Sequence, residues 1–160
     1  LQFIDAPGHA PHQLCIRETR NGGVFTGEAA GSVLGDGNIL FPFNSPPGFD
    51  LARFINTIDR LLKLNATAIY YSHFGVTNSV PENLKLMMRR VMAWDNIVSQ
   101  AIANNMTDSI GERIAAEVHS ELELARRNQP LYDFIRMNIP VCAAAYLKYY
   151  QGKQKASVKQ

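Results

Sequence analysis

Short apolar runs separated by glycine- and proline-containing turns dominate the first part of the chain. Leu1–Ile4, Gln13–Ile16 and Gly23–Thr26 each have the length and side-chain content expected of a β-strand. The turn at 20–23, with sequence RNGG, lies between the second and third runs and predicts a β-hairpin.

The pattern then changes from strand to helix and back to strand. The Gly- and Pro-rich segment 31–47 predicts a long loop, suited to the surround of an active site, with a short strand over 38–43. Asp50 is placed as the N-cap of a helix that ends near residue 65, because apolar residues follow it at helical spacing. The β-branched and aromatic run Thr67–Tyr71 predicts the next strand. This order favours an α/β layer architecture.

After residue 79 the spacing of apolar residues is helical throughout. Ser79 can cap a first helix, and Thr107 or Asp108 a second. Pro130 opens a third helix, which Pro140 is expected to break or kink. We therefore divide the chain into an α/β part over 1–79, a helical extension over 80–151 and a flexible polar tail over 152–160.

Composition and charge exclude several classes of protein. The 160 residues carry 16 Lys and Arg against 14 Asp and Glu, and the net charge of +2 argues against nucleic acid or an anionic membrane as a partner. No uncharged run reaches the roughly 18 residues of a membrane span. Two distant cysteines, Cys15 and Cys142, do not form a disulfide framework, so we expect a reducing, cytoplasmic location.

Three residues with metal-ligand chemistry follow predicted strands. His9 lies in the turn PGHAPH, Glu28 follows the third apolar run in FTGEAAG, and His73 follows the strand ending at Tyr71. Imidazole and carboxylate are ligands that zinc accepts. Taken singly, a histidine in a turn is more often a surface residue, and a glutamate after a strand is usually just solvated.

The order and spacing of these motifs resemble the metallo-β-lactamase-fold hydrolases, and in particular their glyoxalase-II-like branch. The matching runs are PGHAPH, FTGEAAG and, after a helix and a strand, SHFG, all within residues 1–75. The resemblance implies an α/β fold: the C-terminal half of a metallo-β-lactamase αββα sandwich, followed by a C-terminal helical extension.

The resemblance also implies a site and a reaction. His9 would ligate one metal ion, His73 a second, and Glu28 would bridge the two. The implied cofactors are two divalent ions, zinc first, with iron or manganese as alternatives. The implied enzyme is a metallo-hydrolase whose metal-activated hydroxide attacks an ester, thioester, lactone or phosphoester in a small-molecule substrate.

Two departures from the family pattern matter. The motif H-x-H-x-D-H is absent from the chain, so this chain alone lacks a complete site and its expected partner is the missing N-terminal half of the same fold. Glu28 stands where the family has Asp, and if it does not bridge, one metal is expected. His12 and Asp5 could support a ligand or face the substrate, but each could equally serve only its own turn.

A non-catalytic alternative explains the same residues. In that interpretation the metal site is degenerate, and the protein is a binding or assembly module whose C-terminal helices form an interface, including one between identical chains. A nucleic-acid-processing role is disfavoured by the balanced charge.

Overall fold

The computed structural model describes residues 1–35 and 39–157. The strands are β1 (Gln2–Asp5), β2 (Leu14–Arg17), β3 (Val24–Gly27), β4 (Ser32–Leu34), β5 (Ile39–Phe41), β6 (Ile69–Tyr71) and β7 (Val76–Thr77). The α-helices are α1 (Leu51–Lys63), α2 (Val80–Ala103), α3 (Ile110–Glu117), α4 (His119–Ala125) and α5 (Gln129–Ser157), and two 3₁₀ turns are η1 (Ser72–Phe74) and η2 (Thr107–Ser109).

Five strands form one mixed sheet in the order β1-β2-β3-β6-β7. β2 is antiparallel to both β1 and β3, whereas β3 is parallel to β6 across a connection that contains α1. β1, β3 and β6 therefore run in the same direction. Their carboxyl ends lie at one edge of the sheet, and each is followed by one of the predicted ligand residues.

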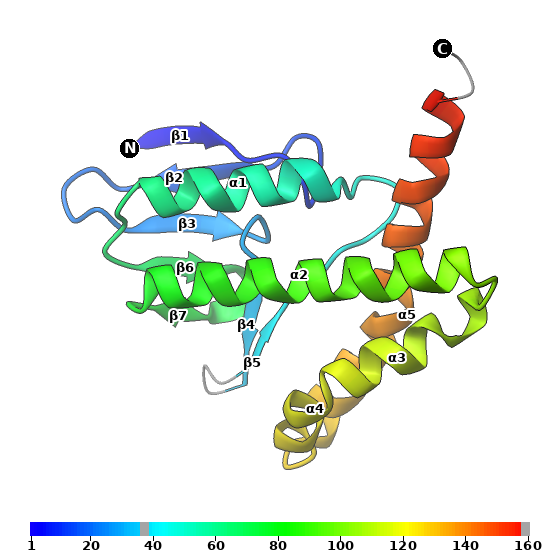
Figure 1. Ribbon diagram of the computed structural model, residues 1–160. Helices are drawn as coiled ribbons and strands as arrows, with labels where there is room; N and C mark the ends of the chain where they lie inside the picture. Colours follow the sequence, from blue (N-terminus) through cyan, green and yellow to red (C-terminus); the bar gives the residue numbers. More distant parts are fainter. Residues whose placement is uncertain (36–38, 158–160) are drawn as a thin grey trace. The chain divides into compact units, whose positions relative to one another are not determined.

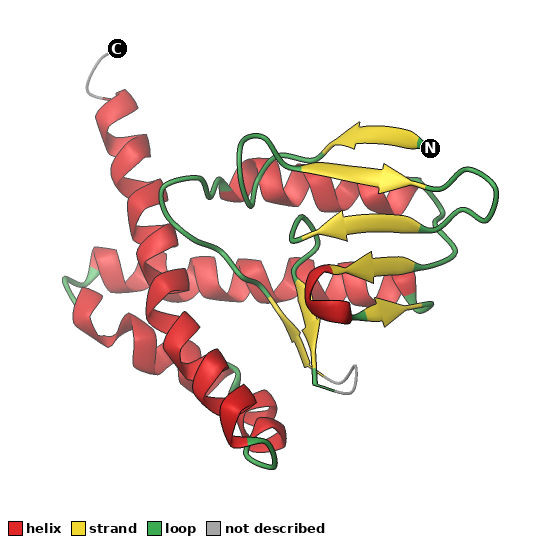
Figure 2. Ribbon diagram, turned by 180° about the vertical axis from the view of Figure 1, so that it is seen from behind, coloured by secondary structure: helices red, strands yellow, loops and turns green. Residues whose placement is uncertain are grey.

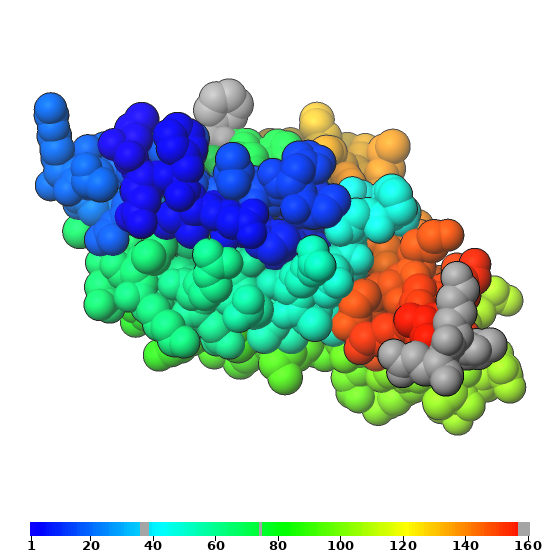
Figure 3. All heavy atoms as spheres, turned by 90° about the horizontal axis from the view of Figure 1, so that it is seen from above, coloured from blue at the N-terminus to red at the C-terminus, as the bar shows by residue number. Residues whose placement is uncertain are grey.

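One face of this sheet is covered by helices. Figures 1 and 2 show α1 and the first half of α2 on the same side of the strands, and Figure 3 shows the first strands and α1 as adjoining bands. Cys15, Val24 and Ile69 point to this side and are buried. The predicted N-cap is confirmed, because the Asp50 carboxylate accepts a hydrogen bond from the Arg53 backbone N–H.

The segment 31–47 differs from its prediction. The short strand predicted over 38–43 is present as β5, but it pairs with an unpredicted strand, β4, and we term this antiparallel pair the ribbon. Both strands are buried along their whole length, so the alternation that reveals a half-buried strand is missing. Asn38, the first residue of the predicted strand, lies outside the described residues. The two-residue strand β7 was also not predicted.

The C-terminal helices follow the predicted spacing but not all predicted bounds. The second predicted helix is divided at Val118, whose backbone leaves the helical region (φ −99°, ψ 25°), into α3 and α4. α5 continues through Pro140 as one helix and extends to Ser157, past the start of the predicted tail at 152. Residues 158–160 of that tail lie outside the described part. No helix among the described residues is both long and apolar enough to cross a membrane.

The chain packs as two compact units. The first contains residues 1–43 and 50–91, and the second contains 44–49 and 92–160. The boundary between the units falls inside α2, whereas the sequence placed it before this helix. The second unit has its own core around the buried Trp94 and Tyr146, and the Trp94 indole N–H donates to the Glu117 carboxylate at 2.8 Å.

The buried thiol of Cys15 provides a test of the packing between sheet and helices. Burial raises the pKa of this thiol to about 12, with Arg60 opposing the shift. In a Cys142→Ser variant at pH 8, we expect Cys15 to react with a disulfide reagent only when urea unfolds the protein, because little thiolate exists and access is blocked. Rapid reaction of Cys15 in the folded protein would contradict this packing.

Candidate metal centre

The turn that carries His9 is fixed to the start of α1. The Asp50 backbone N–H donates to the Gly8 carbonyl at 2.8 Å, and the Thr57 hydroxyl donates to the Pro7 carbonyl at 2.7 Å. Both contacts join residues more than forty positions apart in the sequence. The two residues that precede His9, Pro7 and Gly8, thus each accept a tertiary hydrogen bond that holds the turn in place.

Glu28 follows a distortion at the end of β3. The pairing of β3 with β6 shifts register between Phe25 and Gly27, and Gly27 has the left-handed φ of +55°. A tight turn follows, in which the Ala29 N–H donates to the Thr26 carbonyl at 3.1 Å. This geometry turns Glu28 out of the strand and towards the sheet edge.

His73 has an unusual backbone conformation in η1. Its φ of 61° and ψ of 30° lie in the left-handed region, which non-glycine residues seldom occupy. The surrounding loop is closed because the Tyr71 N–H donates to the Gly75 carbonyl at 2.8 Å. Gly75 itself lies against β4, where an added Cβ would come within 2.5 Å of the Val33 Cβ. The tight loop therefore sustains a conformation of the kind that concentrates at functional sites.

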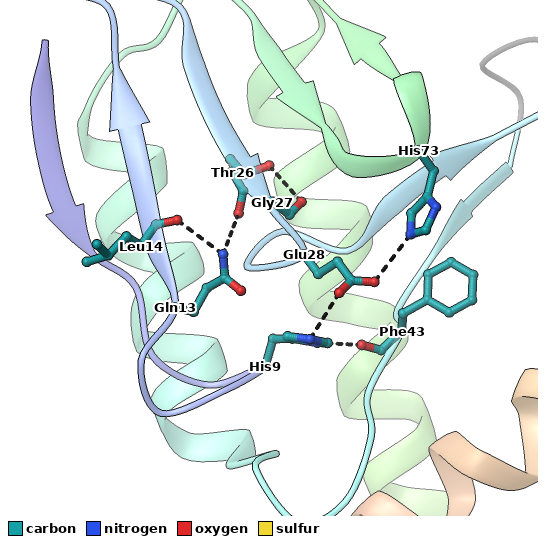
Figure 4. A network of polar contacts seen from close by, with 8 residues as sticks. All are labelled: His9, Gln13, Leu14, Thr26, Gly27, Glu28, Phe43 and His73. Carbon is teal, nitrogen blue, oxygen red and sulfur yellow. Dashed lines mark hydrogen bonds and ion pairs between the residues drawn. The ribbon is translucent and has the colours of Figure 1, made fainter.

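The three predicted ligand residues meet at the carboxyl edge of the sheet (Figure 4). His9 Nε2 lies 3.1 Å from Glu28 Oε2, and His73 Nε2 lies 3.4 Å from Glu28 Oε1. The His9 side chain is 13% exposed and that of His73 is 44% exposed. Each imidazole thus faces a different oxygen of one carboxylate, one from a sheltered and one from an open position.

Hydrogen bonding defines the state of the His9 ring. Its Nδ1 lies 2.6 Å from the Phe43 carbonyl oxygen, which can only accept, so Nδ1 carries a proton. Nε2 then faces the Glu28 carboxylate, and a proton or a metal ion must lie between these two atoms for them to attract. Burial lowers the pKa of His9, but the hydrogen bond and charge of Glu28, aided by the Phe43 carbonyl, outweigh it and raise the pKa overall.

The Glu28 carboxylate is correspondingly held in its charged form. The hydrogen bond from His9 lowers its pKa, and this effect, with the charge of His9 and the contact to His73, outweighs the opposing effect of burial. An ionised carboxylate and an Nδ1–H bonded to a carbonyl both suit metal binding, which also requires that His9 Nε2 release the proton that it shares with Glu28.

The spacing of these donor atoms suits shared metal coordination. Zinc bonds to nitrogen and oxygen of about 2.0–2.2 Å place two tetrahedral ligands about 3.4 Å apart, close to the two nitrogen–oxygen distances at Glu28. Each position receives only one nitrogen and one oxygen from these residues. In residues 1–35 and 39–157, no group of three or more His, Cys, Asp and Glu side chains is placed to hold one ion.

Asp5 and His12 do not join this network of described residues. Asp5 ends β1 opposite Leu14, and His12 lies in the turn before β2; both are exposed. Phe43 does join it, although the sequence indicated only that its segment could approach the site. Its contribution is a backbone carbonyl, which no sequence motif reveals.

The sequence and the structure of this chain can be compared with those of known proteins. No protein-family model and no curated protein sequence matches it. Its structure resembles a metallo-β-lactamase family protein from Thermus thermophilus, with a TM-score of 0.61 and 19% identity over 96% of this chain. A metallo-β-lactamase superfamily protein from Sulfolobus tokodaii also matches 57% of this chain and 33% of its own, at 23% identity and a TM-score of 0.48.

The chain therefore has the metallo-β-lactamase fold, which confirms the fold class implied by the sequence motifs. It spans 44% of the length of the Thermus protein, less than half. At this level of identity the likeness concerns the fold. The glyoxalase-II-like branch and the role of each ligand stay predictions.

The contact between Gly8 and α1 can be tested by adding one methyl group. Gly8 has a φ of +142°, and a Cβ there would lie 2.3 Å from the Phe54 Cα. We expect Gly8→Ala to lower the free energy of unfolding by about 2–4 kcal/mol. Gly111→Ala is the control, because Gly111 has no atom within 4 Å of an added Cβ and lies in a helix, where Ala adds up to about 1 kcal/mol. Urea denaturation followed by circular dichroism measures both, and equal effects would contradict the described contact.

Proposed function

We propose that this chain supplies His9, Glu28 and His73 as metal ligands to a hydrolase that cleaves an ester, thioester, lactone or phosphoester in a small molecule. The observation that carries this proposal is the carboxylate of Glu28 shared by two imidazoles at the carboxyl edge of a metallo-β-lactamase-type sheet. A bound divalent ion supplies a water of lowered pKa and polarises the bond under attack.

The residues of this chain have separate tasks in that reaction. His9, fixed through Nδ1 to a carbonyl, presents Nε2 from a sheltered position. Glu28 presents one oxygen to each side, and this arrangement supports a bridging role despite its extra methylene relative to the family's Asp. His73 faces solvent, so its side of the site is the more accessible to a substrate. Zinc is the first candidate for this donor set, and iron and manganese are alternatives.

Metal content is the direct test of this proposal. The sample is the longest in-frame translation product of the gene, expressed in medium supplemented with zinc, iron or manganese. Its metal content is measured by elemental analysis after purification. We expect about two ions per chain, a lower content in Glu28→Ala and His73→Ala, and chelator-sensitive hydrolysis of an ester, thioester and lactone panel. His119→Ala is the matched control, because His119 is an exposed histidine on α4 whose nearest charged partner is Glu123 at 4.0 Å.

The outcomes separate the two candidate functions. Bound metal that falls in both site variants and persists in the control supports the hydrolase. Absence of metal under all three supplements would refute it, and the non-catalytic binding module would then account for the chain. About one ion per chain, lost with Glu28, would support a single-metal site.

The uncovered face of the sheet bears on the partner of this chain. Cross-strand neighbours place Phe3 beside Ile16, Ile16 beside Phe25, Phe25 beside Tyr70, and Tyr70 beside Val76. Phe25 and Tyr70 stack with ring centroids 4.7 Å apart. Phe3, Phe25 and Val76 remain 65%, 49% and 55% exposed. A continuous apolar row of this kind marks an interaction surface.

We propose that a second sheet, formed by a further segment of the same protein that carries the remaining metal ligands, packs on this face. The uncovered apolar row supports the proposal, as does the 44% share of the Thermus protein that the chain spans. Cys15 and Cys142 are both buried and are not joined in a disulfide, which is compatible with the reducing, cytoplasmic location that we propose for the whole protein.

Thiol labelling can test whether this face is covered. In Val76→Cys, we expect rapid labelling in this chain alone and strong protection in the longest in-frame translation, because a second sheet would exclude the reagent. Met137→Cys, at a position 74% exposed on α5, is the control that should label in both forms. Equal labelling of Val76→Cys in both forms, or a gene without a longer reading frame, would contradict the proposal.

A further inference from the structure

Phe43 contacts both candidate histidine ligands at once. Its backbone carbonyl accepts the hydrogen bond from His9 Nδ1 at 2.6 Å. Its ring lies against the imidazole of His73, with centroids 5.7 Å apart and planes inclined by 46° (Figure 4). This separation is typical of aromatic pairs that interact favourably. One residue therefore touches two histidines that are 64 positions apart in the sequence.

The ribbon holds Phe43 in this place. Phe43 follows β5 and is buried, and its ring packs on that of Phe41 with centroids 5.0 Å apart. The guanidinium of Arg90, on α2, donates to the Leu40 carbonyl within β5. A residue in such surroundings has little freedom to move, and it transfers that restriction to its neighbours.

The opposite strand of the ribbon also lies close to neighbouring elements. Gly31 precedes β4 with a φ of +77°, and an added Cβ there would lie 2.1 Å from the Met87 Cε on α2. Val33, within β4, lies against Gly75 in the loop that carries His73. The ribbon therefore connects α2 with the His73 loop, and the residue that contacts His9 follows it two positions after β5.

We propose that Phe43 is a positioning residue for both candidate ligands, His9 and His73. Only its expected effect on metal affinity rests on the proposed function. Its carbonyl fixes the proton on His9 Nδ1 and so directs Nε2 to Glu28. Its ring limits the orientations of His73, whose side chain is 44% exposed. The ribbon thereby sets the separation of the two imidazoles across one carboxylate.

The two contacts of Phe43 respond differently to mutation, which makes the proposal testable. A side-chain substitution removes the ring but keeps the carbonyl. Phe43→Leu should therefore release His73 while leaving the His9 hydrogen bond intact. Phe43→Tyr retains an aromatic ring and should preserve both contacts. Ile39→Val is the matched control, because Ile39 is a buried apolar residue of the same ribbon, in β5.

Nuclear magnetic resonance of the imidazole groups in the metal-free chain gives the first readout. His9→Gln and His73→Gln variants assign the signals. We expect a slowly exchanging Nδ1–H signal for His9 in the parent, in Phe43→Leu and in Ile39→Val. We expect the ring-current displacement of the His73 carbon-bound protons to be lost in Phe43→Leu and kept in Phe43→Tyr and Ile39→Val.

Zinc titration of the longest in-frame protein gives the second readout. Loss of an outer contact to a ligand weakens metal binding by about tenfold or more, so we expect that loss in Phe43→Leu and recovery in Phe43→Tyr. The positioning role would be overturned if His73 signals did not change in Phe43→Leu, if Ile39→Val changed them equally, or if His9 lacked the protected proton. Failure of the parent to bind zinc, iron or manganese would overturn the proposed hydrolase instead, while the resonance data would still decide the role of Phe43.

Discussion

The parallel direction of β1, β3 and β6 is the constraint on which the rest of this structure depends. Each of these strands ends at the same edge of the sheet, so the residues that follow them are brought together irrespective of their distance in sequence. Glu28 follows the central strand of the three and can therefore face His9 on one side and His73 on the other. The same arrangement with antiparallel neighbours would place these side chains at opposite edges.

Strand direction alone does not aim side chains, and close backbone contacts complete the arrangement. Gly8 lies directly on the backbone of α1, and Gly75 lies directly on β4, so both loops are held where a side chain would not fit. His73 retains a left-handed backbone in one of these loops. Such conformations cost free energy and persist only where the surroundings determine them. Favourable packing in the first unit thus offsets the free-energy cost of the backbone conformations that orient the imidazoles.

The site and the uncovered sheet face have a common implication. The site offers one nitrogen and one oxygen to each metal position, which is fewer than the four ligands of a zinc centre. The sheet face that none of the described helices covers leaves a row of apolar side chains in water. The protein therefore forgoes the favourable hydrophobic free energy that burial of these side chains would give. The proposed further segment would satisfy both requirements, because it would add both ligands and a second sheet.

The main elements and the three candidate ligands could be predicted from the sequence, because periodicity, the Asp50 cap and the motifs around His9, Glu28 and His73 are local signals. It predicted β5 but not β4, since a strand buried on both faces does not alternate, and it did not predict that α5 continues through Pro140. Only the tertiary structure revealed the contacts of Phe43, because a carbonyl exists at every residue and its partner depends on how distant segments meet. The reason for this difference is physical. Short-range preferences are encoded residue by residue, whereas the distances between the imidazoles and the carboxylate arise from the packing of whole elements.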